Sequence, residues 1–287
     1  EQIRHGARLA KLGNFKGILW DPEAYKPGVN PWKYPEQTQA SKHSYPEYYE
    51  QARKRGRRFI QVIQEEFPGL TIHALRGISD FQTGSPFSEK ILPISDAEQA
   101  QAALENAWWG LHLPFMVGIL DEMDDDVNFV DGNEDAYYYT SALEYYQLRD
   151  IIYDQALSLI PDDLHDTYRN QYTIGHAVSV DYIVGNWAGY LNGFSYRLAG
   201  QGKVLSAEER ARWFEHNMYY ALSTADEYAW LYSEEANWWS GRDVPEGFPE
   251  ALQRAKQKVA DNEPLGFGVE ERLKQAQDQA EKDFAKK

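Results

Sequence analysis

The stretch Phe-Lys-Gly-Ile-Leu-Trp-Asp-Pro-Glu-Ala-Tyr, residues 15–25, is the part of the sequence that decides the fold. An apolar run of strand length leads into two carboxylates, Asp21 and Glu23. Pro22 ends the strand because it has no N–H to donate. While the chain stays extended, side chains two residues apart leave the same face. Acids at the carboxyl end of a strand are typical of catalytic groups in a (β/α)8 barrel.

The same pattern of a short apolar strand recurs along the chain, at residues 70–75, 127–130, 172–180 and 228–232. Helical periodicity fills the intervals between these runs. This alternation predicts an α/β fold in which a parallel sheet is connected by crossover helices.

Sequence signals also mark the helix boundaries. Ser44 with Glu47 predicts a capping box at the start of one helix, and Ser206 and Glu209 predict another. A further capping box at Ser95 predicts a helix that is kinked at Pro114 and ends before Met123. Two more helices are expected near 249–261 and 269–285.

Two α/β architectures are compatible with this order. A doubly wound nucleotide-binding sheet predicts a glycine-rich turn after its first strand, and the sequence has neither Gly-x-Gly-x-x-Gly nor a P-loop. A (β/α)8 TIM barrel fits better, but eight units at this spacing need about 400 residues. We therefore expect a TIM-barrel domain over residues 1–245 that lacks its first strands, followed by a C-terminal helical extension over 246–287. The alternative is an eight-stranded fold with further short strands in the loops.

Composition narrows the class of partner. The net charge of −16 argues against nucleic acid, because phosphate binding needs a basic surface. No run approaches the roughly 18 apolar residues of a membrane span, so no membrane insertion is expected. The chain has no cysteine, which excludes thiolate catalysis and cysteine-ligated zinc. Aromatic residues make up 14% of the chain, and flat rings stack on the apolar faces of sugars as well as filling cores.

Acids follow three of the expected strands. Asp131 and Glu134 follow the third, and Glu234 follows the fifth. Glycoside hydrolysis in its common form needs two carboxyl groups that flank the scissile bond, one of them protonated near neutral pH. We expect Glu23 to act as general acid/base, with Glu134 or Glu234 as its partner. Asp21 and Asp131 are expected to tune or orient these groups.

Aromatic and polar side chains near the acids are candidates for substrate binding. Core packing is the alternative for each indole ring, and a place in a polar network is the alternative for the histidine. The expected binding residues are Tyr25, Trp32, Tyr137, His176, Asn237, Trp238 and Trp239. No cofactor is expected, and the expected partner is a carbohydrate substrate.

Several motifs together resemble poorly characterised bacterial proteins that have a glycoside-hydrolase-like TIM barrel. The first motifs are Lys-Gly-Ile-Leu-Trp-Asp-Pro-Glu-x-Tyr, Asn-Pro-Trp at 30–32, and Arg-x-Arg-Gly-Arg-Arg at 53–58 ahead of Phe-Pro at 67–68. Asp-Gly-Asn-Glu at 131–134, Trp-Leu-Tyr-Ser-Glu at 230–234 and Asn-Trp-Trp at 237–239 complete the set. The resemblance covers roughly residues 7–239 and implies a carbohydrate-active barrel with additional strands ahead of residue 1.

Two other functions are compatible with the sequence. One is a metal-dependent sugar isomerase, in which Asp131, Glu134, His176 and Asp181 supply hard oxygen and imidazole ligands. The other is a barrel that binds sugars without cleaving them. The sequence carries no signal for the oligomeric state.

Overall fold

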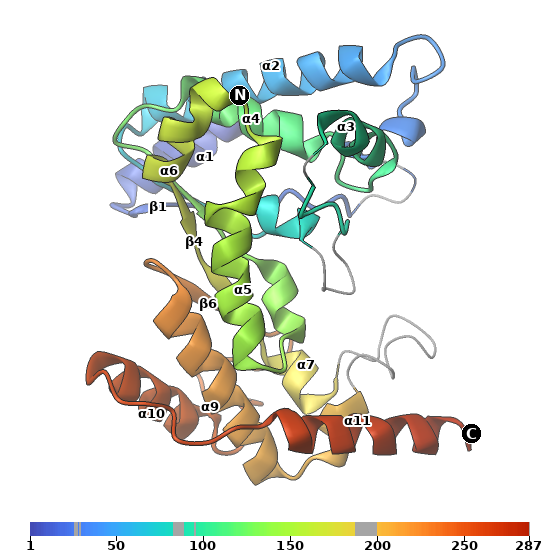
Figure 1. Cartoon of the computed structure of the whole chain (residues 1–287). Helices are drawn as coiled ribbons and strands as arrows, with labels where there is room; N and C mark the ends of the chain where they lie inside the picture. Colours follow the sequence, from blue (N-terminus) through green and yellow to red (C-terminus); the bar gives the residue numbers. More distant parts are fainter. Residues whose placement is uncertain (26–27, 29, 83–88, 95, 187–199, 287) are drawn as a thin grey trace. The chain divides into compact units, whose positions relative to one another are not determined.

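The computed structural model describes residues 1–25, 28, 30–82, 89–94, 96–186 and 200–286 (Figure 1). The chain divides into two compact units. Unit 1 comprises Glu1–Asn133 and Leu148–Ile174, and unit 2 comprises Glu134–Gln147 and Gly175–Lys287. One boundary between them falls within helix α5 (Ala142–Tyr153).

Unit 1 is built on a four-stranded parallel sheet in the order β1-β2-β3-β4. Its strands are β1 (Gly17–Trp20), β2 (Thr71–Ala74), β3 (Asn128–Asp131) and β4 (Tyr172–Ile174). Its helices are α1 (Gln2–Leu12), α2 (Tyr45–Glu66), α3 (Ala97–Asn106), α4 (His112–Glu122) and α6 (His165–Gln171). The register pairs Trp20 with Ala74, Ala74 with Asp131 and Asp131 with Ile174. The carboxyl ends of the four strands are therefore level.

Helices α2 and α4 of unit 1 pack at close range because each has a glycine at the contact. A Cβ atom on Gly56 would lie 1.9 Å from the carbonyl oxygen of Phe115, and one on Gly118 would lie 2.0 Å from that of Arg53. No larger residue fits at either position. Beside this contact the Arg53 guanidinium donates to Asp121 at 2.6 and 2.7 Å, so part of the basic run in α2 ties the two helices together.

Unit 2 contains a two-stranded parallel sheet formed by β5 (His176–Ser179) and β6 (Ala229–Tyr232). Its helices include α7 (Val180–Val184), α9 (Ala207–Thr224), α10 (Phe248–Ala260) and α11 (Glu270–Phe284). The core packs Phe214 of α9 against Phe248 of α10, with ring centroids 4.3 Å apart and nearly parallel planes. Leu273 and Ala276 of α11 belong to the same core, so both C-terminal helices help to form unit 2.

The structure confirms an α/β fold with parallel strands, and all the expected strand positions are occupied. The expected strand at 172–180 is divided at Gly175: its first half pairs with β3 and its second half with β6. Neither sheet is closed into a barrel by the strands that the structure describes.

The helix boundaries agree with the capping signals in two places and differ in a third. The expected capping boxes at Ser44 and at Ser206 are present. The single helix expected before Met123 is instead two helices, α3 and α4, and Pro114 lies in the first turn of α4. Ser95 lies outside the described residues, and the Asp96 side chain caps α3 by accepting from the Gln99 N–H. None of the helices that the structure describes is both long enough and apolar enough to cross a membrane.

Candidate functional site

The carboxyl ends of the parallel strands carry two groups of acids, one in each unit. In unit 1, Asp21 and Glu23 follow β1. In unit 2, Asp181 and Glu234 each lie two residues beyond the last residue of β5 and β6. Because loops at this edge of a parallel sheet hold most α/β active sites, each group is described in turn.

Asp21 and Glu23 in unit 1 are joined by a local turn. The Glu23 N–H donates to Asp21 Oδ1 at 2.9 Å, so the Asp21 carboxylate accepts a hydrogen bond from the backbone just after Pro22. The Tyr25 hydroxyl lies 2.6 Å from both Asp21 Oδ2 and Glu23 Oε2. Desolvation of this hydroxyl and its hydrogen bonds to the two acids raise the pKa of Tyr25, although the ring itself is exposed. The phenol therefore stays protonated and binds one carboxylate at a time.

Arg76, two residues beyond β2, completes the group in unit 1. Its Nε donates to Glu23 Oε1 at 3.0 Å, and a second nitrogen donates to Asp80 Oδ1 at 2.9 Å. The guanidinium also lies over the Trp109 ring, 5.3 Å from its centroid. Arg76 thus holds Glu23 in an ion pair and fixes its position.

Asp131, the last residue of β3, is fully buried and acts as an organiser of the neighbouring turn. Its Oδ1 accepts from the Ser79 hydroxyl at 2.6 Å and its Oδ2 from the Ser79 N–H at 2.9 Å. The Tyr172 hydroxyl donates to Oδ2 at 2.6 Å. A Cβ atom on Gly77 would lie 2.4 Å from Oδ2, so only glycine lets the chain pass here. Asp131 positions the segment that carries Arg76, as an orienting residue would.

Asp181 and Glu234 in unit 2 are brought together by the pairing of β5 with β6, which sets Ser179 beside Tyr232. The Glu234 N–H donates to Asp181 Oδ2 at 2.8 Å. Asp181 is 6% exposed, whereas Glu234 is exposed. Neither carboxylate forms an ion pair with another residue in the described part of the chain.

The two acids of unit 2 have different surroundings. Burial raises the pKa of Asp181, the N–H of Glu234 opposes that effect, and the charges of Glu234 and Glu235 add to it. The Tyr232 hydroxyl donates to Glu234 Oε1 at 2.7 Å. Burial, this hydrogen bond and the surrounding negative charge raise the pKa of Tyr232, which keeps the phenol protonated as a donor.

The remaining expected acid, Glu134, belongs to the same neighbourhood. It begins a 3-10 turn that packs against β5, and its charge is among those that raise the pKa of Tyr232. Tyr137 of this turn is 2% exposed and packs against Trp230 and Tyr232, with both ring centroids at 5.4 Å. Tyr137 therefore supports the site from behind and offers no exposed face to a sugar.

His176 lies in the core of unit 2. It is fully buried, its Nε2 is 3.0 Å from the Thr224 hydroxyl, and the Tyr145 ring packs edge-on against it. The structure thus places His176 in a buried polar contact. Within the described residues, no three histidine, aspartate or glutamate side chains are grouped to hold a metal ion.

The other expected binding residues fall into two places. Trp32 is half-buried in unit 1, where its Nε1 donates to the Pro22 carbonyl at 2.7 Å. In unit 2, Asn237 accepts the N–H groups of Trp239 and Ser240 and shapes a turn after β6. Trp239 is fully exposed, and Trp238 stacks on Phe214 at 6.3 Å. Trp239 is the indole in this turn that is free to stack on a ligand.

Sequence reasoning missed three residues of these groups. The sequence places Asp181 only among the ligands of the metal-dependent alternative and Tyr232 only within the Trp-Leu-Tyr-Ser-Glu motif, and it gives Arg76 no role. Asp181 and Glu234 occupy equivalent positions beyond neighbouring strands, a signal that was visible once the strand ends were fixed. Arg76 carried no such signal, because its contact with Glu23 spans 53 residues of sequence.

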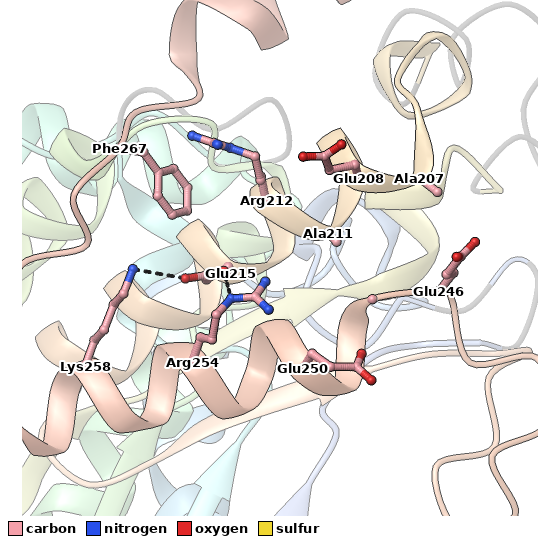
Figure 2. A pocket seen from close by; sticks show the side chains of 11 residues that line it. Ala207, Glu208, Ala211, Arg212, Glu215, Glu246, Glu250, Arg254, Lys258 and Phe267 are labelled. Carbon is pink, nitrogen blue, oxygen red and sulfur yellow. Dashed lines mark hydrogen bonds and ion pairs between the residues drawn. The ribbon is translucent and has the colours of Figure 1, made fainter.

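A groove of about 740 Å³ lies between α9 and α10 in unit 2, away from the strand ends (Figure 2). Glu215 of α9, which is 3% exposed, accepts from Arg254 at 2.6 Å and from Lys258 at 3.1 Å. Figure 2 shows both bases reaching from α10 to this acid. The two bases compensate the charge of the buried acid and hold the helices together, which is a structural role.

Comparison of the chain with models of protein families, with curated proteins and with solved structures finds no match. The geometry of the two acidic groups is therefore the basis for assigning a function.

Proposed function

We propose that this protein is a glycoside hydrolase of the (β/α)8-barrel type that cleaves an oligosaccharide or polysaccharide. Parallel strands with acids beyond their carboxyl ends support the barrel assignment, because catalytic groups of such barrels occupy this edge. Tyrosine and tryptophan side chains beside the acids, among them the exposed Trp239, support a carbohydrate substrate.

The observation that carries the proposal is the unequal pair in unit 2. Asp181 is nearly buried and its pKa is raised, whereas Glu234 is exposed and accepts a phenolic hydrogen bond. A glycosidase needs this division, with one carboxyl group that holds a proton and one that is ionised. We assign Asp181 as the general acid and Glu234 as the partner base or nucleophile. Glu134 lies near enough to contribute to the negative field.

Glu23 has a different part in this proposal. Its ion pair with Arg76 fixes the carboxylate in place, as suits a base or a group that orients substrate hydroxyls. Glu23 therefore remains a candidate carboxylate of the reaction, but not its acid. The metal-dependent alternative gains nothing from the site, because the oxygens of Asp131 and Nε2 of His176 are engaged in other hydrogen bonds.

The test begins with a panel of aryl glycosides and polysaccharides assayed for released phenol or reducing ends. On any substrate that is cleaved, Asp181→Asn and Glu234→Gln should each lower kcat by roughly 100-fold or more, the size of an acid or base contribution. Glu250→Gln, an exposed acid on α10, is the matched control and should keep full activity. Full activity in both site variants would overturn the assignment of the pair, and no cleavage across the panel would count against hydrolysis.

A further inference from the structure

A second groove, of about 630 Å³, lies in unit 1 between the segment 31–43 and helix α2. Leu111 and Phe115 contribute its apolar floor. The strand-end acids do not line it, and the glycosidase chemistry proposed above does not use it.

The aromatic side of this groove is rigid. Trp32 is held by its hydrogen bond to the Pro22 carbonyl, and its ring packs against His112 at 4.8 Å and Phe115 at 5.3 Å. Tyr48 of α2 lines the facing wall and is fixed edge-on against Tyr34, at 5.3 Å. Rings that are fixed before a ligand arrives lose little conformational entropy when it binds.

The polar side of the groove presents hydroxyl and amide groups that can form hydrogen bonds with a ligand. The side chains of Thr38, Gln39 and Gln51 line it and form no hydrogen bond with the residues that the structure describes. Hydroxyl and amide groups both donate and accept, as the hydroxyl groups of a sugar do. Placed around fixed rings, they suit a ligand with apolar faces and a polar edge.

The charge of the groove selects among such ligands. With histidine neutral, Glu47 and Arg55 are the charged residues of the described lining, and their formal charges cancel. Glu47 is already engaged by the capping box of α2 and by His43 at 3.2 Å. The chain as a whole carries −16, so a neutral groove is a local departure from its surface. An uncharged ligand meets no repulsion here, and an anionic ligand gains no net attraction.

We propose that this groove binds an uncharged segment of an oligosaccharide, stacked on Trp32 and held by the amides of Gln39 and Gln51. Trp32 joins the groove to the Asp21–Glu23 turn, because it donates to the carbonyl of the proline between the two acids. The inference deepens the proposed function by naming a neutral glycan as the substrate class, but binding in the groove does not require cleavage.

The test is affinity electrophoresis of the full chain in gels that contain neutral polysaccharides (starch, xylan, mannan and mixed-linkage β-glucan) or anionic ones (polygalacturonate and alginate). At least one neutral polymer should retard the protein, and the anionic polymers should not. Gln51→Ala, on an exposed helix position, should weaken this binding roughly three- to tenfold, the value of one or two hydrogen bonds. Trp32→Ala should weaken it by at least roughly tenfold, as loss of a buried aromatic contact does.

Matched controls separate binding from folding and from catalysis. Gln253→Ala on α10 and Trp108→Ala, an exposed indole outside the groove, should bind as the unaltered protein does. Thermal unfolding of Gln51→Ala checks that its fold is intact. Asp181→Asn should lose cleavage and keep binding in the groove. If the unaltered protein is retarded by a neutral polymer but cleaves no substrate, the proposed hydrolase is rejected and this inference stands. The inference is overturned if only anionic polymers retard the protein, or if no polymer does. It is also overturned if Gln51→Ala is retarded as strongly as the unaltered protein, or if a peptide binds in a way that depends on Gln51.

Discussion

The acid groups of unit 1 and unit 2 share a plan and differ in one component. Both groups hold two carboxylates beyond the carboxyl ends of parallel strands, from β1 alone in unit 1 and from β5 and β6 in unit 2. In each, a tyrosine two residues from the glutamate donates to it: Tyr25 to Glu23 at 2.6 Å and Tyr232 to Glu234 at 2.7 Å. Arg76 neutralises Glu23 in unit 1. In unit 2, neither Asp181 nor Glu234 has an ion pair with a described residue.

This difference determines what each group can do. The guanidinium fixes Glu23 in place, so the unit 1 group suits binding or orientation of a ligand. Two carboxylates without such a partner repel each other, and the more buried one is driven towards its protonated form. Asp181 is that residue, because burial is the largest contribution to its raised pKa. The two groups therefore differ in whether an arginine side chain contacts the glutamate.

Removal of Arg76 should have the largest effect on stability. The side chain of Arg76 is 10% exposed and that of Asp80 is 1% exposed, so Arg76→Leu leaves a buried carboxylate without its guanidinium. We expect a loss of about 3 kcal/mol or more in the free energy of unfolding, measured by urea denaturation. Arg76→Leu/Asp80→Asn should recover part of this loss.

Arg58→Leu is the control for this experiment, because Arg58 and Glu65 form an exposed pair at 3.6 Å. Its urea midpoint should not change measurably. If Arg76→Leu also left the urea midpoint unchanged, the Arg76 ion pairs would contribute no stability, and they would not distinguish unit 1 from unit 2.

The two tyrosines should differ in their effect on activity. Tyr232→Phe removes a hydrogen bond to Glu234, which has no ion pair to hold it, and we expect kcat to fall by about tenfold. Tyr25→Phe leaves Glu23 held by Arg76, so we expect a fall of less than about threefold. Steady-state kinetics on the substrate found in the panel measures both. Equal losses would mean that Arg76 does not substitute for the phenol.

Much of the fold could be predicted from the sequence because its signals are local. Ser44 with Glu47 marks a helix start by side-chain bonds within four residues, and the proline after Asp21 marks a strand end without reference to the rest of the chain. The break between α3 and α4 was not visible. It depends on contacts such as the Leu111 N–H donating to the Trp32 carbonyl, 79 residues apart in the sequence.

The candidate site was less predictable because its chemistry depends on partners from other elements. Asp21 and Glu23 could be recognised as a pair, but the ion pair of Glu23 with Arg76 depends on a residue that follows the next strand. The sequence leaves ligand binding and a polar network open for His176, because the contact of its Nε2 with Thr224 joins residues 48 positions apart. Sequence spacing predicts the edge of the sheet where the acids lie, whereas burial and ion pairing, which raise the pKa of Asp181 and bind Glu23 to Arg76, depend on the folded chain.

The smallest expected effect is a change in stability caused by a substitution in unit 2. Its sign tests whether burial raises the pKa of Asp181, the proposed general acid. The pKa of Asp181 is raised above its ordinary value of 3.8 in the folded protein. The folded state therefore holds this proton more tightly than the unfolded state, and the stabilisation present below pH 3.8 is lost as the pH rises through the folded-state pKa. Asparagine does not titrate in this range, and its side-chain oxygen can still accept the Glu234 N–H.

Asp181→Asn should therefore gain stability relative to the unaltered protein as the pH rises from 3 to 7. Its Tm at pH 7 should be higher by less than roughly 4 °C, the shift that about 1 kcal/mol produces in a domain of this size. Asp278→Asn, at an exposed position on α11, should show no such trend with pH. A Tm difference that shrinks as the pH rises would mean that a favourable partner holds Asp181 ionised. Unit 2 would then resemble unit 1, and the acid of the proposed reaction would have to be sought elsewhere.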